Sequence, residues 1–361
     1  MVTIQVSVSK GWLHQQGNFT FSERYYFDPL FRWNQDRDAD LFVVNTFPDL
    51  PIYNMESNLI QAKYFNPRQV LIGGIQPNML LGMAVGARLN CSADKDSDID
   101  SKPFETLNNT NELPKLQSLL ESETIRLFDS QLETIKSEHP NIEPIPPFFW
   151  DSSGRATIHG LITTAQKLFG EKIFMTMIDD PKSFSEILLW ITEAYILLIR
   201  HYSFLANINI SSIHIGECSG TMISGDQFSE NVVPFIDRFG EEFNSVRLHS
   251  CGYSDHLIEA FSKIKNLSII DTGSRTSIAK IRSMLGNEFK INVAPPVECL
   301  VQSTDKHSII SWVDKTIGDN ADGPLQIVFH IEPDYSIARC LLIFDCLQKK
   351  GISIKRIKYG C

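Results

Sequence analysis

The sequence lacks the features that mark several large classes of protein. It has no Gly-x-Gly-x-x-Gly fingerprint, so nothing in it supports a dinucleotide site. No apolar run reaches the roughly eighteen residues of a membrane span, and the first residues lack the charged start and apolar middle of a signal peptide. Lys and Arg number 33 against 43 Asp and Glu, without a basic face for nucleic acid. We therefore expect a cytoplasmic protein that binds neither membranes nor nucleic acid.

Cysteine is present, but not in a disulfide pattern. The 7 cysteines are an odd number without regular spacing. In a reducing compartment such cysteines are packing residues, metal ligands or nucleophiles. Cys340 and Cys346 lie in an apolar run and are expected in the core.

From about residue 156 the chain alternates short apolar strands with helices, which is typical of a parallel β/α architecture. With an earlier strand at 69–76, the expected strands are 156–160, 212–217, 246–250, 267–271, 289–293, 325–330 and 352–357. The chain has 361 residues, and 43% of them are hydrophobic, enough for a large core. We predict an α/β fold, a (β/α)8 TIM barrel with an N-terminal extension, and an open doubly wound sheet is the alternative.

The predicted domain division follows from this pattern. Residues 1–68 are expected to form the extension, and 69–361 the barrel, with a polar insertion at about 90–150. Within the insertion, every second residue from Asp94 to Asp100 is an aspartate, as in a calcium-binding loop. Ile99 stands where that loop requires glycine, so a solvated acidic loop is expected instead.

Ionisable residues gather where the expected strands end. His249 and Cys251 are two apart, so on a strand they point to the same side. In barrels of this class the chemistry lies at the C-terminal ends of strands, and imidazole, thiolate and carboxylate together are the ligands of catalytic zinc. We expect His249, Cys251 and His330 to bind the metal, with Cys299 as the rival for the third position.

Two carboxylates end neighbouring strands and are candidate catalytic residues. Glu217 and Asp271 could accept or donate a proton, or supply a fourth metal ligand. The structural alternatives are a salt bridge for Glu217 and a loop cap for Asp271. Cys218, next to Glu217, is expected to face the opposite way and to serve in packing.

Several phrases resemble the uroporphyrinogen decarboxylase superfamily, and within it the corrinoid-dependent methyltransferases. They are Gly160-Leu-Ile-Thr-Thr-Ala, Phe169-Gly-Glu, Asp180-Pro, Leu248-His-Ser-Cys-Gly and Val328-Phe-His-Ile-Glu-Pro-Asp. The fourth is similar to the His-x-Cys-Gly zinc motif of the methyltransferases. In the fifth, His330 stands where that branch has a cysteine ligand. The arginine-rich substrate motif of the decarboxylases is absent.

This resemblance implies a zinc-dependent transfer of a methyl group between a small thiol or methylated compound and a corrinoid carried on a partner protein. A decarboxylase of a tetrapyrrole-like substrate and a non-catalytic corrinoid-binding barrel are the alternatives. The sequence does not identify the methyl donor or acceptor, nor the oligomeric state.

Overall fold

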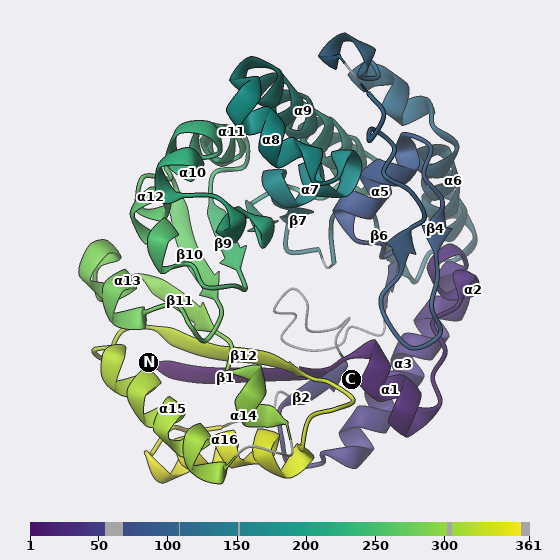
Figure 1. The fold of residues 1–361 in the computed structure, drawn as a ribbon. Coiled ribbons are helices and arrows are strands. Elements are labelled where there is room, and N and C mark those ends of the chain that lie inside the picture. The colour runs from purple at the N-terminus through teal and green to yellow at the C-terminus, as the bar shows by residue number, and fades with distance from the viewer. Residues whose placement is uncertain (55–67, 108, 151, 302–304, 355–361) are drawn as a thin grey trace.

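A curled sheet of parallel strands forms the centre of the computed structural model, which describes residues 1–54, 68–107, 109–150, 152–301 and 305–354. The strand order is β2-β1-β12-β11-β10-β9-β8-β7, and Figure 1 shows helices around the outside of the curl. The strands of this 8-stranded sheet are β1 (Val2–Val8), β2 (Ile52–Asn54), β7 (Arg155–His159), β8 (Ser212–Gly216), β9 (Val246–Ser250), β10 (Leu267–Thr272), β11 (Lys290–Val293) and β12 (Leu325–Ile331). The predicted α/β class is confirmed, and the curled parallel sheet agrees with a barrel-like fold.

Helices connect most of these strands. The α-helices are α1 (Lys10–Gly17), α2 (Glu23–Phe27), α3 (Pro29–Thr46), α5 (Pro77–Ala84), α6 (Glu123–Glu138), α7 (Leu161–Phe169), α8 (Lys172–Asp179), α9 (Pro181–Ala206), α10 (Gly225–Asn231), α11 (Val233–Phe243), α12 (Ile258–Ser262), α13 (Ile278–Leu285), α14 (Val297–Leu300), α15 (Lys306–Asp319) and α16 (Ile337–Lys349). Short 3-10 turns lie at η1 (Thr110–Glu112), η2 (Leu116–Glu121), η3 (Ser219–Met222) and η4 (Asp255–Leu257). No helix in the described part of the chain combines the length and apolar character needed to cross a membrane.

The two faces of the sheet differ in polarity, as β12 illustrates. One face of β12 is buried and apolar: Leu325, Ile327, Phe329 and Ile331. The residues between them, Gln326, Val328 and His330, are half-buried and point to the opposite face of the sheet. We call the concave side of the curled sheet (Figure 1) the lumen. This period-two alternation is that of a strand with a single fully packed face. The core therefore lies between the sheet and its surrounding helices, and polar side chains line the lumen.

The expected N-terminal extension is not confirmed, because residues 2–8 form β1 inside the main sheet. β1 pairs along its length with β12, from Val2 beside Leu325 to Val8 beside Ile331. Val2, Ile4, Val6 and Val8 alternate with polar residues, which is the local signature of such a strand. Beyond this correction, the domain boundaries stay a prediction.

Two other expected strands lie outside the main sheet. The segment expected at 69–76 gives β3 (Gln69–Leu71), which pairs with β6 (Glu143–Ile145) in a separate two-stranded sheet. Residues 352–354 form no strand, and the rest of the segment expected at 352–357 lies outside the described residues. A hydrogen bond from Thr157 N to Phe148 O, 2.8 Å long, links edge strand β7 to the segment that follows β6.

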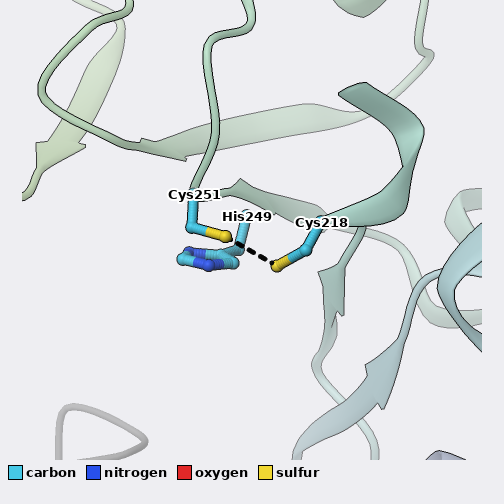
Figure 2. Close-up of side chains that lie close together, drawn as sticks. All are labelled: Cys218, His249 and Cys251. Atoms are coloured by element: carbon cyan, nitrogen blue, oxygen red, sulfur yellow. Dashed lines mark hydrogen bonds between the residues drawn. The ribbon is translucent and has the colours of Figure 1, made fainter. Parts of the chain in front are cut away.

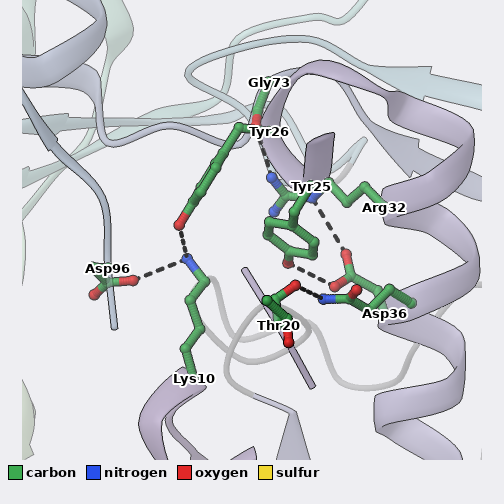
Figure 3. A network of polar contacts seen from close by, with 9 residues as sticks. Lys10, Thr20, Tyr25, Tyr26, Arg32, Asp36, Gly73 and Asp96 are labelled. Carbon is green, nitrogen blue, oxygen red and sulfur yellow. Dashed lines mark hydrogen bonds and ion pairs between the residues drawn. The ribbon is translucent and has the colours of Figure 1, made fainter. Parts of the chain in front are cut away.

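A buried polar network attaches the first helices to the rest of the fold (Figure 3). Arg32 of α3 is buried, donates a hydrogen bond of 2.7 Å to Gly73 O and pairs with Asp36 at 3.3 Å. Tyr25 donates to the same carboxylate at 2.7 Å. Gly74 adopts φ +62°, and a Cβ there would lie 1.7 Å from Arg32 Nη1, so this turn requires glycine.

The acidic loop is held by cations of the chain itself. It contains the antiparallel pair β4 (Leu89–Asn90) and β5 (Asp98–Ile99). Lys10 pairs with Asp96 at 2.9 Å, as Figure 3 shows, and Lys167 pairs with Asp98 at 2.7 Å. These ion pairs fit the expected surface loop and leave a calcium site without support.

Placing β1 inside the sheet makes a testable prediction. Val6 is fully buried and Thr3 is exposed on the same strand. We expect Val6→Asp to abolish folding, because an unpaired buried carboxylate costs several kcal/mol, comparable with the stability of a domain. Soluble yield and cooperative thermal unfolding measure the effect, with Thr3→Asp as the matched control. If residues 1–68 were a separate extension, the barrel would keep its unfolding transition in Val6→Asp.

Candidate metal centre

Three potential metal ligands converge at the C-terminal ends of β8 and β9. One ligand atom from each of Cys218, His249 and Cys251 lies within 4.8 Å of the others, and the two sulfur atoms are 3.1 Å apart. Figure 2 shows the two thiols facing one another beside the imidazole. Cys251 is exposed, and the other two residues are half-buried. The cluster is therefore reachable from solvent through Cys251.

The register of β8 against β9 brings the two cysteines together. Gly216 lies beside His249, so the residues two further along each strand, Cys218 and Cys251, also face one another. Glu217 N donates a 2.7 Å hydrogen bond to His249 O, which extends the ladder to the point where β8 turns into η3. The cluster is thus a product of parallel strand pairing.

His249 is supported from behind by a buried ion pair. Its Nδ1 lies 3.4 Å from Asp271 Oδ2, and Arg247 Nη2 lies 2.6 Å from the same oxygen. A carboxylate behind a ligating histidine fixes the tautomer and the orientation of the ring. Asp271 and Arg247 therefore hold His249 with its other edge toward the thiols.

The charges in the cluster favour thiolate ligation. A hydrogen bond with Cys218 and another with His249 lower the pKa of Cys251 to about 4. The same contact between the sulfurs, together with burial, raises the pKa of Cys218. Burial alone would lower the pKa of His249, but the charge of Asp271 raises it to about 10. The two shifts favour a thiolate at Cys251 beside a positively charged His249.

Asp271 is a weak base in this setting. Burial would raise its pKa, but the charges of His249 and Arg247 hold that pKa well below the usual range. A carboxylate that stays ionised between two cations does not readily accept a proton. These contacts support an orienting role for Asp271, while the predicted catalytic role stays a prediction.

Glu217, the other predicted catalytic residue, points away from the lumen. Its carboxylate accepts hydrogen bonds from Ile162 N at 3.1 Å and Thr163 N at 3.0 Å, at the start of α7. The N-cap of α7 is Gly160, which has no side chain, so Glu217 supplies the missing acceptor. A Cβ on Gly160 would lie 2.2 Å from Glu217 Oε2, so glycine is required there. These contacts support a structural role.

Neither proposed third ligand belongs to the described cluster. His330 lies on β12, where its Nδ1 contacts Ser7 Oγ of β1. Cys299 is buried in α14. The ligand role of His330 stays a prediction.

Cys218 was expected to serve in packing, and the structure places its thiol beside the side chains of the predicted ligands His249 and Cys251. The expectation that it faces opposite to Glu217 is correct, but Glu217 is the residue on the helix side and Cys218 the one at the lumen. The half-buried residues His214 and Gly216 continue to Cys218 at a spacing of two, which is the signal that identifies its face.

Two thiols and an imidazole with a carboxylate behind it form a donor set that suits zinc. Zinc sites in proteins use cysteine sulfur and histidine nitrogen, and catalytic sites keep one position for water or substrate. Softer thiolate donors disfavour magnesium and calcium. The described residues therefore fit a zinc ion at Cys218, His249 and Cys251.

Comparisons with known proteins identify one matching family and similar solved structures. The family model described as uroporphyrinogen decarboxylase matches residues 78–329. A solved methyltransferase from Methanosarcina mazei is similar over 97% of this chain and 94% of its own, with a TM-score of 0.62 and 14% identity. A B12-independent methionine synthase from a Shewanella species, solved with selenomethionine, gives a TM-score of 0.46 at 10% identity over 96% of this chain and 95% of its own. No curated protein sequence matches the chain.

The family match extends over more than half of the sequence and includes the strands that carry the cluster, from β7 into β12. The chain therefore belongs to the uroporphyrinogen decarboxylase family, as the sequence resemblance predicted.

The contacts of Asp271 predict an effect on metal affinity. Asp271→Asn keeps the shape but removes the charge that orients His249, so we expect zinc affinity to fall about 10- to 100-fold. Competition with a chelator measures this, and Asp98→Asn, a surface acid paired with Lys167, is the matched control. Unchanged affinity in Asp271→Asn would contradict the orienting role.

The contacts of Glu217 predict an effect on stability. Glu217→Gln replaces one of the two carboxyl oxygens that accept hydrogen bonds from α7 with an NH2 group, which cannot accept them. We expect this change to lower the free energy of unfolding by about 1–3 kcal/mol. Burial raises the pKa of Glu217 from 4.5 to about 7, so its contribution is complete below about pH 4.5 and is lost as the pH rises through about 7. Denaturant unfolding at several pH values should show the deficit shrinking toward alkaline pH. Full stability with abolished turnover would instead indicate catalysis.

Proposed function

We propose that this chain is a zinc-dependent methyltransferase that moves a methyl group between a small thiol or methylated compound and a corrinoid carried on a partner protein. The observation that carries the proposal is the convergence of Cys218, His249 and Cys251 at the C-terminal ends of β8 and β9. Membership of the family alone does not decide between reactions, because one fold serves many chemistries.

The residues of the cluster suit the activation of a thiol. A free thiol has a pKa of about 8.5, and a bound zinc would supply the charge that makes its thiolate available at neutral pH. Cys218, His249 and Cys251 would hold the ion, and Asp271 with Arg247 keeps the imidazole in place. Three protein ligands leave the position that a substrate thiol needs.

Exposed apolar side chains near the cluster could contact a partner protein. Met222, Tyr253 and Val297 are 59%, 55% and 55% exposed, and they follow β8, β9 and β11 at the same end as the cluster. Large apolar side chains exposed around a site are typical of interaction surfaces. A carrier domain that brings a corrinoid to the lumen would cover them.

A decarboxylase is the second candidate, and the family match favours it. Such an enzyme binds the carboxylates of its substrate through arginines, but the family's arginine-rich motif is absent from the sequence. Incubation with uroporphyrinogen separates the two functions. We expect no release of carbon dioxide, and release that survives removal of the metal would favour the decarboxylase.

The proposed ligands predict how cysteine substitutions change the zinc content of the protein. We expect Cys218→Ser to lose most of the zinc that the wild-type protein retains after dialysis, because serine is a poor zinc ligand. Cys299→Ser is the matched control and should retain it, since Cys299 is buried outside the cluster. Elemental analysis gives the metal content, and transfer of methyl groups from a methylcorrinoid to small thiols gives the activity.

The same measurement tests His330. Its predicted role as a ligand requires His330→Gln to lose zinc as well. Retention of zinc in Cys218→Ser with loss in His330→Gln would place the site on β12 instead.

A further inference from the structure

Cys218 and Cys251 lie close enough together for a covalent bond between their sulfur atoms. The two Sγ atoms are 3.1 Å apart and face one another in Figure 2. A disulfide bond is about 2.0 Å long, so its formation requires the sulfur atoms to approach by only about 1 Å. The geometry of the reduced pair is therefore close to that of an oxidised pair.

The backbone around the two cysteines permits such a bond. β8 and β9 pair up to Gly216 beside His249, and the hydrogen bond from Glu217 N to His249 O extends this pairing. Neighbouring strands lie about 4.7–4.9 Å apart, which is within the range of about 4.4–6.8 Å between the Cα atoms of disulfide-bonded cysteines. Both cysteines lie beyond the paired residues of their strands, which end at Gly216 and Ser250. The bond can therefore form without breaking the pairing of the strands.

The exposure of the cysteines determines which of them an oxidant meets first. Among the described residues, Cys251 is the exposed cysteine, and Cys218 is half-buried beside it. The other described cysteines are buried or half-buried and lie outside the cluster: Cys91, Cys299, Cys340 and Cys346. An exposed cysteine with a second cysteine next to it is typical of redox-sensing sites, because the second thiol reacts with the oxidised sulfur.

We propose that hydrogen peroxide oxidises Cys218 and Cys251 to a reversible disulfide, and that this bond releases the metal from the cluster. The sulfur of Cys251 attacks one oxygen of the peroxide and becomes a sulfenic acid, while the other oxygen leaves as water. The sulfur of Cys218 then attacks the sulfenic sulfur, forms the S–S bond and expels a second molecule of water. Two thiols lose two electrons in total, and one peroxide gains them.

The disulfide and a bound metal exclude one another. The thiolate is the form of cysteine that binds metals, and a disulfide sulfur carries no such charge. The oxidised cluster therefore keeps one of its three described ligands, His249. A dithiol reverses the change by exchange, since it restores both thiols and is itself oxidised to a disulfide. The disulfide follows from the geometry alone, and only the release of metal rests on the proposed function.

The experiment treats the full-length protein with hydrogen peroxide, both loaded with zinc and after removal of metal by a chelator. Alkylation of the denatured protein followed by mass spectrometry counts the free thiols and locates cross-linked peptides. A chromogenic chelator records the zinc that is released. Cys218→Ser is the test variant, and Cys91→Ser, at the other half-buried cysteine of the described residues, is the matched control.

We expect the metal-free wild-type protein and metal-free Cys91→Ser each to lose two free thiols per chain, with a cross-link between Cys218 and Cys251. Dithiothreitol should restore both thiols. In the zinc-loaded forms, the same cross-link should accompany the release of about one zinc ion per chain. Cys218→Ser should lose one thiol instead of two, and the oxidation of Cys251 should continue to a sulfinic acid that dithiothreitol does not reduce.

The outcomes separate the disulfide from the proposed function. A Cys218 thiol that stays free in the wild-type protein, whether or not Cys251 is oxidised, would overturn the disulfide, as would a cross-link between other cysteines in its place. A cross-linked protein that retains its zinc would overturn the release of metal. Absence of zinc from the untreated protein contradicts the proposed function, and the metal-free protein then tests the disulfide by itself.

Discussion

The parallel pairing of β8 with β9 is the constraint on which the candidate site depends. Gly216 lies beside His249, and this register alone decides that Cys218 meets Cys251. A shift by one residue would turn every side chain of β8 to the opposite face and bring Glu217 into the lumen. The buried apolar residues Ile213 and Ile215 oppose such a shift, because they would leave the core for the lumen. The packing of β8 against the surrounding helices therefore determines which of its side chains face the lumen.

The carboxylate of Glu217 reinforces the same register from the helix side. It joins the end of β8 to the first turn of α7, whose N–H groups have no acceptor within their own helix. Because Glu217 immediately precedes Cys218, the contact that anchors one residue also sets the direction of the next. Glu217, whose predicted catalytic role stays a prediction, thus also helps to fix the position of Cys218.

The sequence predicted the parallel architecture because that information is local. Periodicity identified the strands at 212–217, 246–250 and 267–271, and the His249–Cys251 spacing identified two of the three residues of the cluster. The place of β1 was missed because its partner is β12, more than 300 positions away, and no local pattern encodes that pairing. The role of Cys218 was missed for a related reason. Alternation gave the correct relation between Glu217 and Cys218, but only the contact with α7 shows which of the two faces the helices.

His330 shows the limit of reasoning from strand ends. Asn292 lies beside Gln326, so the residue of β12 in line with His249 and Asp271 is Gln326, and His330 lies four positions further on. Strands of a curled sheet are staggered, so residues that each end a strand need not lie at one height. A position at the end of a strand therefore predicts that a residue lies at the C-terminal edge of the sheet. It does not predict which residues of neighbouring strands lie beside it.

The polarity of the lumen is the remaining argument for function. A curled sheet needs only apolar packing to be stable, and replacing a buried ion pair by well-packed apolar residues is often neutral or stabilising. The lumen instead contains the Arg247–Asp271 pair, donors without a described partner, and His159 and His214, whose pKa values are lowered by burial. Such groups oppose folding unless a bound ion or ligand satisfies them, since an unpaired buried polar atom costs about 1–3 kcal/mol. Several polar atoms near His249 therefore lower the stability of the protein alone, and a bound ligand that formed hydrogen bonds with them would offset that cost.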